Sequence, residues 1–85
     1  MMPVPEISLG KYMIARLIET KPKTAVYNIL STHHGAKLGQ IKWYGPWRQY
    51  VFESEPLTIF NRDCMLAICG FLQGFMDARK KEAKS

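Results

Sequence analysis

The sequence predicts an α+β protein, in which a four-stranded antiparallel meander is followed by one C-terminal helix packed on one face, the order ββββα. Two observations lead to this prediction. Segments rich in β-branched and aromatic residues are separated by short turns with Gly or Pro, and a long final segment repeats apolar residues at helical spacing. A three-stranded sheet is the alternative, because the first segment fits either a strand or a helix.

That first segment covers residues 12–19. Met13, Ile14, Leu17 and Ile18 fit a helical stripe, yet alternation about Arg16 also fits a strand. We favour the strand, because the short turn at 21–23 leads directly into another β segment and a single helix already covers the sheet.

The other strands are predicted at 24–31, 38–44 and 47–53. A turn over 33–36 and the pair Gly45–Pro46 connect them. In the middle strand, Ile41 and Trp43 alternate with polar neighbours, so one face is expected to point to the core and the other to solvent or a ligand.

The helix is predicted from about 62 to about 80. Asn61 is placed to cap its first turn, and Asp63 lies at the positive end of the helix dipole. The expected core face consists of Cys64, Met65, Ile68, Cys69, Phe71, Leu72, Phe75 and Met76. The two cysteines point in different directions around the helix, so they are interpreted as small core residues rather than a disulfide.

The 85 residues are too few for two domains. We expect a loosely ordered segment at 1–10, a single domain at 11–80 and a basic tail at 81–85. No apolar stretch is long enough to span a bilayer and no secretory signal is present, so a cytoplasmic location and no membrane partner are expected.

Twelve Lys and Arg against seven Asp and Glu give a net charge of +5, which favours anionic partners. The carboxylates are scattered, neither cysteine has an obvious histidine partner, and His33–His34 lies in a predicted turn without further metal ligands. We therefore expect no enzyme activity, no catalytic residue, no metal and no cofactor.

The most informative segment is the hairpin at 41–52, which contains both tryptophans. Rings projecting from a sheet can stack on unpaired bases while neighbouring cations neutralise phosphates. The candidate residues for binding nucleic acid or a partner are Lys42, Trp43, Tyr44, Trp47, Arg48 and Tyr50. A structural interpretation stays open, in which Trp43 and Phe52 enter the core and Trp47 shields the turn.

A second candidate surface is a patch of small residues on the helix, which would allow a homodimer through close backbone approach. It consists of Ala67, Gly70, Gly74 and Ala78. The alternative is that these residues let the helix lie close to its own sheet.

The run IKWYGPWRQYVF at 41–52, with KPKTAVY at 21–27 and TIFNRDCM at 58–65, resembles a group of small uncharacterised phage and prophage proteins. The similarity covers roughly residues 12–78. The group has no settled activity or site residues, so the resemblance implies an origin in a mobile element and nothing about chemistry. Residues 53–56 depart from the more apolar FFP-type continuation of the group, which is expected to make this edge more exposed.

These observations favour a non-enzymatic binding protein, with single-stranded nucleic acid as the first partner. The predicted ββββα order is similar to that of the dimeric coactivator-type single-stranded-DNA binders, although a shared fold does not fix a function. The alternatives are an inhibitor of a host protein, such as a counter-defence protein of the anti-CRISPR kind, and a small structural accessory protein. Trp, Tyr and Arg also dominate protein interfaces, so the hairpin fits the inhibitor equally well.

Overall fold

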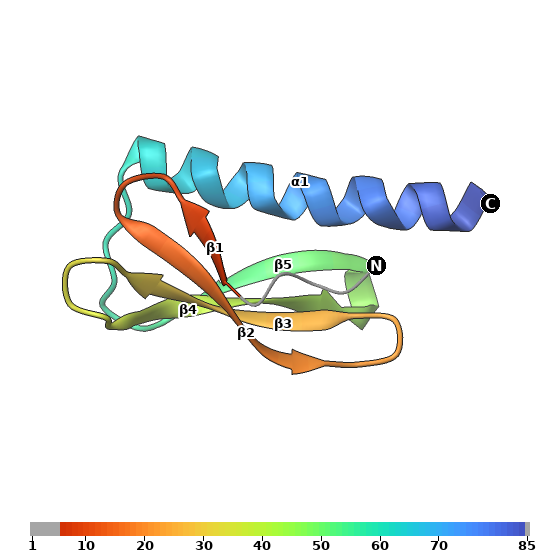
Figure 1. The fold of residues 1–85 in the computed structure, drawn as a ribbon, viewed down its shortest axis with the longest axis horizontal. Coiled ribbons are helices and arrows are strands. Elements are labelled where there is room, and N and C mark those ends of the chain that lie inside the picture. The colour runs from red at the N-terminus through yellow and green to blue at the C-terminus, as the bar shows by residue number, and fades with distance from the viewer. Residues whose placement is uncertain (1–5, 85) are drawn as a thin grey trace.

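The computed structural model describes residues 6–84, and side chains through residue 78 (Figure 1). Its elements are β1 (Glu6–Leu9), β2 (Met13–Thr20), β3 (Ala25–Ser31), β4 (Lys37–Tyr44), the 3₁₀ turn η1 (Gly45–Trp47), β5 (Gln49–Ser54) and α1 (Arg62–Lys84). The predicted α+β meander with a C-terminal helix is confirmed. The described part of the sheet has five strands, so the prediction of four, or three, was too low.

The additional strand is β1, in a segment that we expected to be loosely ordered. It pairs antiparallel with β2, from Glu6 opposite Arg16 to Leu9 opposite Met13. Ile7 and Leu9 alternate with polar residues and pack against the core. This packing stabilises a strand that is short and lies at the edge of the sheet. The expectation of loose order is therefore wrong for residues 6–9, and residues 1–5 lie outside the described residues.

The sheet follows the chain, in the order β1-β2-β3-β4-β5 with every pair antiparallel. Residues 12–19 are confirmed as a strand, since β2 covers almost the same range, with a bulge between Leu17 and Glu19. Strand β5 begins two residues later than predicted, because the chain first completes the 3₁₀ turn.

Helix α1 begins where the sequence predicts. The Asn61 side-chain oxygen accepts a hydrogen bond from the Cys64 amide at 2.8 Å, and Asp63 lies in the first turn. The helix continues to Lys84, so residues 81–84 extend it and do not form a separate tail. Within the described range, no helix combines the length and the hydropathy needed to cross a bilayer.

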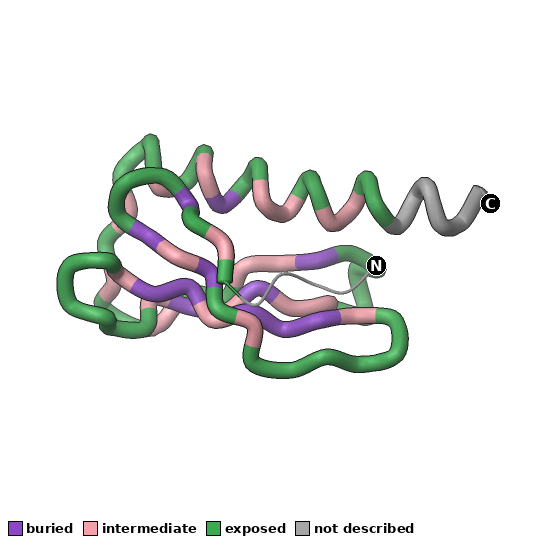
Figure 2. The backbone as a smooth tube through the Cα atoms, viewed as in Figure 1, coloured by how far each residue is buried: buried purple, intermediate pink, exposed green. Residues whose placement is uncertain are grey.

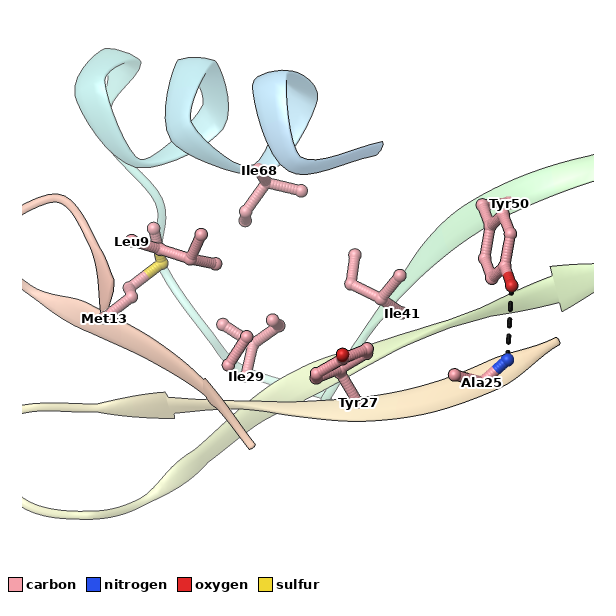
Figure 3. Packing of buried hydrophobic residues seen from close by; sticks show 9 residues of the cluster. Leu9, Met13, Ala25, Tyr27, Ile29, Ile41, Tyr50 and Ile68 are labelled. Carbon is pink, nitrogen blue, oxygen red and sulfur yellow. Dashed lines mark hydrogen bonds between the residues drawn. The ribbon is translucent and has the colours of Figure 1, made fainter. Parts of the chain in front are cut away.

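The core lies between α1 and one face of the sheet. The sheet twists so that both edge strands, β1 and β5, contact the helix (Figure 1). Buried positions follow the central strands (Figure 2), and their side chains converge beneath the helix (Figure 3). The core cluster consists of Leu9, Met13, Ala15, Ala25, Tyr27, Ile29, Ile41, Tyr50 and Ile68.

Tyr27 connects the central strand to the helix. Its ring lies 5.3 Å from that of Phe71 and 5.5 Å from that of Phe75, both on α1. Desolvation by burial, with a smaller contribution from Tyr50, raises the pKa of the Tyr27 hydroxyl above its usual value of 10.0. The neutral phenol is therefore the form that suits this core.

The predicted core face of the helix is too wide. Ile68, Phe71 and Phe75 face the sheet, but Met65 is 57% exposed and Cys69 is also exposed. Met65 and Cys69 lie roughly 60° and 100° around the axis from Ile68, on the side where a groove beside residues 55–61 leaves this part of the helix uncovered. Cys69 is therefore not a core residue, whereas Cys64 is half-buried and packs against the core.

Candidate functional site

The tip of the β4–β5 hairpin presents two aromatic side chains to solvent. Pro46 lies in the first turn of η1, and the Arg48 amide donates a hydrogen bond to the Gly45 carbonyl at 3.0 Å. This tight turn holds the Tyr44 and Trp47 rings edge to face, with centroids 5.0 Å apart. Tyr44 is 39% exposed and Trp47 is 66% exposed, so the pair is a ready surface for stacking.

Arg48 follows the tip and is exposed. Its φ of 53° lies in the left-handed region, which costs free energy for a residue with a side chain. The conformation reverses the chain into β5 directly after the tip. Arg48 therefore places its cationic side chain directly after the exposed Trp47 in the chain.

Lys42 lies on the strand face that points away from the helix, as the alternation predicted. Its ammonium forms an ion pair with the Glu53 carboxylate across the β4–β5 pair, at 3.2 Å. Next to it, the Gln40 amide donates a hydrogen bond to the Asn28 side-chain oxygen at 3.2 Å. Both polar pairs are accessible to solvent at least in part, so this face of the hairpin is hydrophilic.

Two of the predicted binding residues face the other way. Tyr50 is only 6% exposed, and its hydroxyl oxygen accepts a hydrogen bond from the Ala25 amide at 3.2 Å (Figure 3). Trp43 is half-buried, packs against the core and meets Tyr50 edge to face at 5.6 Å. Tyr50 was therefore wrongly predicted as a binding residue, because its place in the strand alternation puts it under the helix, where Phe75 stacks on it at 4.7 Å.

The β2–β3 turn brings cations to the same end of the molecule, which the sequence analysis missed. β3 and β4 pair with Tyr27 opposite Ile41, so this turn lies beside the end of β4 (Figure 1). A groove of about 380 Å³ is lined there by Ile18, Glu19, Lys21, Thr24, Val26, Gln40, Lys42 and Trp43. The sequence does show two lysines in this turn, as KPK at 21–23. Their relation to the hairpin becomes visible only when the register of β3 and β4 is known.

We call this region the basic end. It comprises the β2–β3 turn with Lys21 and Lys23 and the hairpin tip from Tyr44 to Arg48. The backbone of α1 runs in the same direction as the hairpin tip (Figure 1).

The small-residue patch on α1 is divided by the structure. Ala67 is half-buried and packs against the core, whereas Gly70, Gly74 and Ala78 are exposed. A Cβ at Gly70 or Gly74 would meet nothing within 4 Å. The glycines therefore do not serve contact with the protein's own sheet, and the homodimer through this patch stays a prediction.

Among residues 6–78, no three His, Cys, Asp or Glu side chains gather in a group that could hold a metal ion. The His33 ring stacks on that of Tyr12, with centroids 6.5 Å apart. The centroids of the His33 and His34 rings are 6.0 Å apart. These histidines belong to the β3–β4 connection, at the end of the sheet opposite the hairpin tip.

The comparison with known proteins identifies a phage relative. An uncharacterised 9.3 kDa protein of Acholeplasma phage L2 is 30% identical to this chain over 59 residues, which are 69% of this chain and 76% of that protein. The chain belongs to this family of small phage proteins. The search of family models and the search of solved structures gave no match. The phage family agrees with the resemblance noted from the sequence, and the hairpin at 41–52 as its distinguishing motif stays a prediction.

Proposed function

We propose that this member of the phage protein family is a non-enzymatic nucleic-acid-binding protein that holds single strands at the basic end. The observation that carries the proposal is the exposed Tyr44–Trp47 ring pair, which Arg48 follows directly in the chain and which lies at the same end of the molecule as the groove lined by Lys21 and Lys42. Aromatic rings beside cations form a surface on which unpaired bases stack while phosphates are neutralised.

Stacking is the reason to prefer single strands. A ring exposed at the tip of a hairpin can receive the face of an unpaired base, whereas the bases of a duplex already stack on one another. The tip is also held by a 3₁₀ turn and a backbone hydrogen bond, so little ordering of the backbone is required on binding.

The ion pair of Lys42 does not oppose this function. Its two side chains are 35% and 64% exposed, and pairs as exposed as this contribute about 0–1 kcal/mol. A phosphate can therefore compete for the Lys42 ammonium at small cost. Lys21 adds a second cation on the other side of the groove.

A host protein is the alternative partner, and the same exposed Trp47 supports it, because Trp, Tyr and Arg are common at protein interface hot spots. The two functions differ in their dependence on salt. Neutralising phosphates releases counterions, so binding of nucleic acid weakens steeply as salt is raised.

The test uses each tryptophan as a separate reporter. Trp43→Phe leaves Trp47 as the reporter at the exposed tip, and Trp47→Phe leaves the half-buried Trp43 beside Tyr50. Titration with an unlabelled single-stranded oligonucleotide should quench the first variant and saturate, with affinity falling as salt rises. The second variant should change less, because Trp43 is half-buried and packs against the core, so only part of its ring lines the groove of the basic end.

A matched pair of double variants then places the site. Trp47→Ala/Arg48→Ala removes one exposed ring and one cation from the basic end, and Lys11→Ala/Tyr12→Ala removes the same from the β1–β2 turn at the opposite end. The first should weaken oligonucleotide binding by roughly tenfold or more, since each stacked base is worth about 1–3 kcal/mol. Equal binding by both folded variants would refute the proposed site, and an absence of binding by the wild type would refute the function.

A further inference from the structure

An apolar surface lies at the end of the molecule opposite the basic end. A groove of about 610 Å³ separates the β5–α1 connection, residues 55–61, from the first half of α1. Apolar side chains dominate its lining, which includes Phe52, Phe60, Met65, Ile68, Cys69 and Leu72. The Phe60 ring meets Phe52 edge to face at 5.4 Å and forms part of the floor.

Large apolar side chains are exposed along the two segments that enclose this groove. Leu57 and Ile59 are 102% and 93% exposed, so neither contributes packing to its own chain, and Met65 and Leu66 are more than half exposed. We call the groove and these four residues the apolar end. So many large apolar groups gathered at one end of a small protein are typical of an interaction site.

The backbone at Leu57 gives a second, independent sign. Its φ of 63° lies in the left-handed region, which is unfavourable for a leucine and ordinarily taken by glycine. Strained residues of this kind gather at functional sites, where the strained geometry has a use. Here the strain directs a fully exposed leucine outward beside the groove.

We infer that the apolar end is the interface with a second copy of this chain. The exposed area of one chain is 6346 Å², whereas a compact monomer of this mass exposes about 5,200 Å². The chain as a whole therefore leaves more surface exposed than a compact monomer, and a standard interface takes roughly 800 Å² from each partner. A second copy would also enlarge a core to which α1, over its described side chains, contributes only Ile68 as a buried residue.

Shape favours a copy of the same chain. The apolar end has projecting side chains next to a groove, so a twofold axis can place the rim of each copy in the groove of the other. On α1, Met65, Cys69, Leu72 and Met76 follow one another at spacings of four, three and four residues. This is the spacing of the apolar seam along which two helices pack.

Charge does not oppose this contact, although the chain carries +5 overall. At this end Lys37 forms an ion pair with Glu55 at 3.1 Å, and Arg62 is followed by Asp63. Those charges cancel, which leaves Lys11 in the β1–β2 turn as a single further cation at this end among the described residues. The like charges of two copies would instead be kept apart at their basic ends.

The test is sedimentation equilibrium from low micromolar to millimolar concentration. We expect the wild type to approach twice the mass of one chain. Leu57→Ser/Ile59→Ser should raise the dimer dissociation constant roughly a hundredfold or more, because burial of each such side chain is worth at least about tenfold in affinity. Both side chains are almost fully exposed in one chain, so circular dichroism should show an unchanged fold.

Ile18→Ser/Trp47→Ser is the matched control, since it removes two exposed apolar residues at the basic end and should leave the dimer intact. A second readout locates the contact. In a Cys64→Ser background, alkylation of Cys69 should slow as the protein concentration rises, and should not slow in Leu57→Ser/Ile59→Ser.

A wild type that stays monomeric would overturn the inference, whatever other protein binds at this end. A dimer that survives Leu57→Ser/Ile59→Ser would overturn it too. If that dimer were lost in Gly70→Leu/Gly74→Leu, the small-residue patch on α1 would be the interface instead.

Discussion

The two ends of this molecule are built from similar backbone features and present opposite chemistry. Each has a tight connection that carries one non-glycine residue in the left-handed region, Arg48 with φ 53° at the basic end and Leu57 with φ 63° at the apolar end. At one end the strained residue is a cation beside exposed rings. At the other end it is an aliphatic side chain beside an apolar groove.

The difference shows how a small sheet can separate two surfaces. In an antiparallel meander, successive turns lie at opposite ends, so the β2–β3 and β4–β5 turns are together and the β5–α1 connection is far from them (Figure 1). A cation in one turn and a leucine in the next are therefore separated by the length of a strand. This allows both surfaces to be altered independently.

The largest expected effect concerns the strand pair that joins the two ends. A Cβ at Gly39 would collide with the Glu53 carbonyl oxygen and come within 2.6 Å of the Phe52 ring. Gly39→Ala should lower the free energy of unfolding by about 2–4 kcal/mol and disturb both surfaces. Urea denaturation measures this change.

Gly70→Ala is the control for that substitution. A Cβ at Gly70 has no neighbour within 4 Å, and alanine is preferred to glycine in a helix by about 1 kcal/mol. The control should therefore be slightly more stable than the wild type. Equal losses in the two variants would contradict the close approach of β5 to Gly39.

The next effect separates the tyrosines that support the basic end from those that form its surface. Tyr50→Phe removes the acceptor of the Ala25 amide and leaves a buried donor unpaired, which should cost about 1–3 kcal/mol of stability. Tyr44→Phe removes an exposed hydroxyl and should leave stability unchanged. Thermal denaturation distinguishes the two, and an unstable Tyr44→Phe would show that the tip is part of the core.

A smaller gain in stability should accompany loss of binding at each end. Glycine adopts the left-handed backbone conformation without strain. Arg48→Gly and Leu57→Gly should therefore each raise the free energy of unfolding by up to about 1 kcal/mol. Arg48→Gly should weaken binding of the oligonucleotide alone, and Leu57→Gly should weaken the dimer alone.

These two glycine variants are controls for each other, since the backbone change is the same. If Arg48→Gly also dissociated the dimer, the two ends would be coupled. If neither variant gained stability, the left-handed conformations would not be strained in the way that the φ values indicate.

The smallest effect belongs to Tyr27 in the core between the ends. Its pKa is raised above 10.0 by burial, so at alkaline pH the unfolded chain loses this proton before the folded protein does. The stability linked to the neutral phenol is complete below pH 10 and falls as pH rises from there through the folded pKa. Stability of Tyr27→Phe measured against pH should lack this decline, and equal declines would place its cause elsewhere.

Local sequence patterns predicted most of the fold. The Asn61 cap, the short turns and the alternation of Ile41 and Trp43 each depend on nearby residues, and the structure agrees with them. The strand β1 was missed because four residues of edge strand carry little periodicity. Pairing with β2 stabilises β1, and the sequence of residues 6–9 alone does not reveal that pairing.

The candidate site was predicted less completely, since it depends on which residues share an end. Composition identified the hairpin, but could not show that Tyr50 lies under the helix or that the β2–β3 turn lies beside Trp43. The exposed Leu57 and Ile59 were missed for a similar reason. An apolar residue in a loop usually suggests burial, and only the structure shows these two in solvent.

The order of the strands has a consequence for how the chain folds. Each strand pairs with the strand that precedes or follows it, so every hairpin closes a short loop, such as the turn between Ser31 and Lys37 in β3–β4. Short loop closures give a low contact order and rapid folding. During synthesis the strands can therefore pair as they emerge, and α1, which follows them in the chain, completes the core by docking on a sheet that is already assembled.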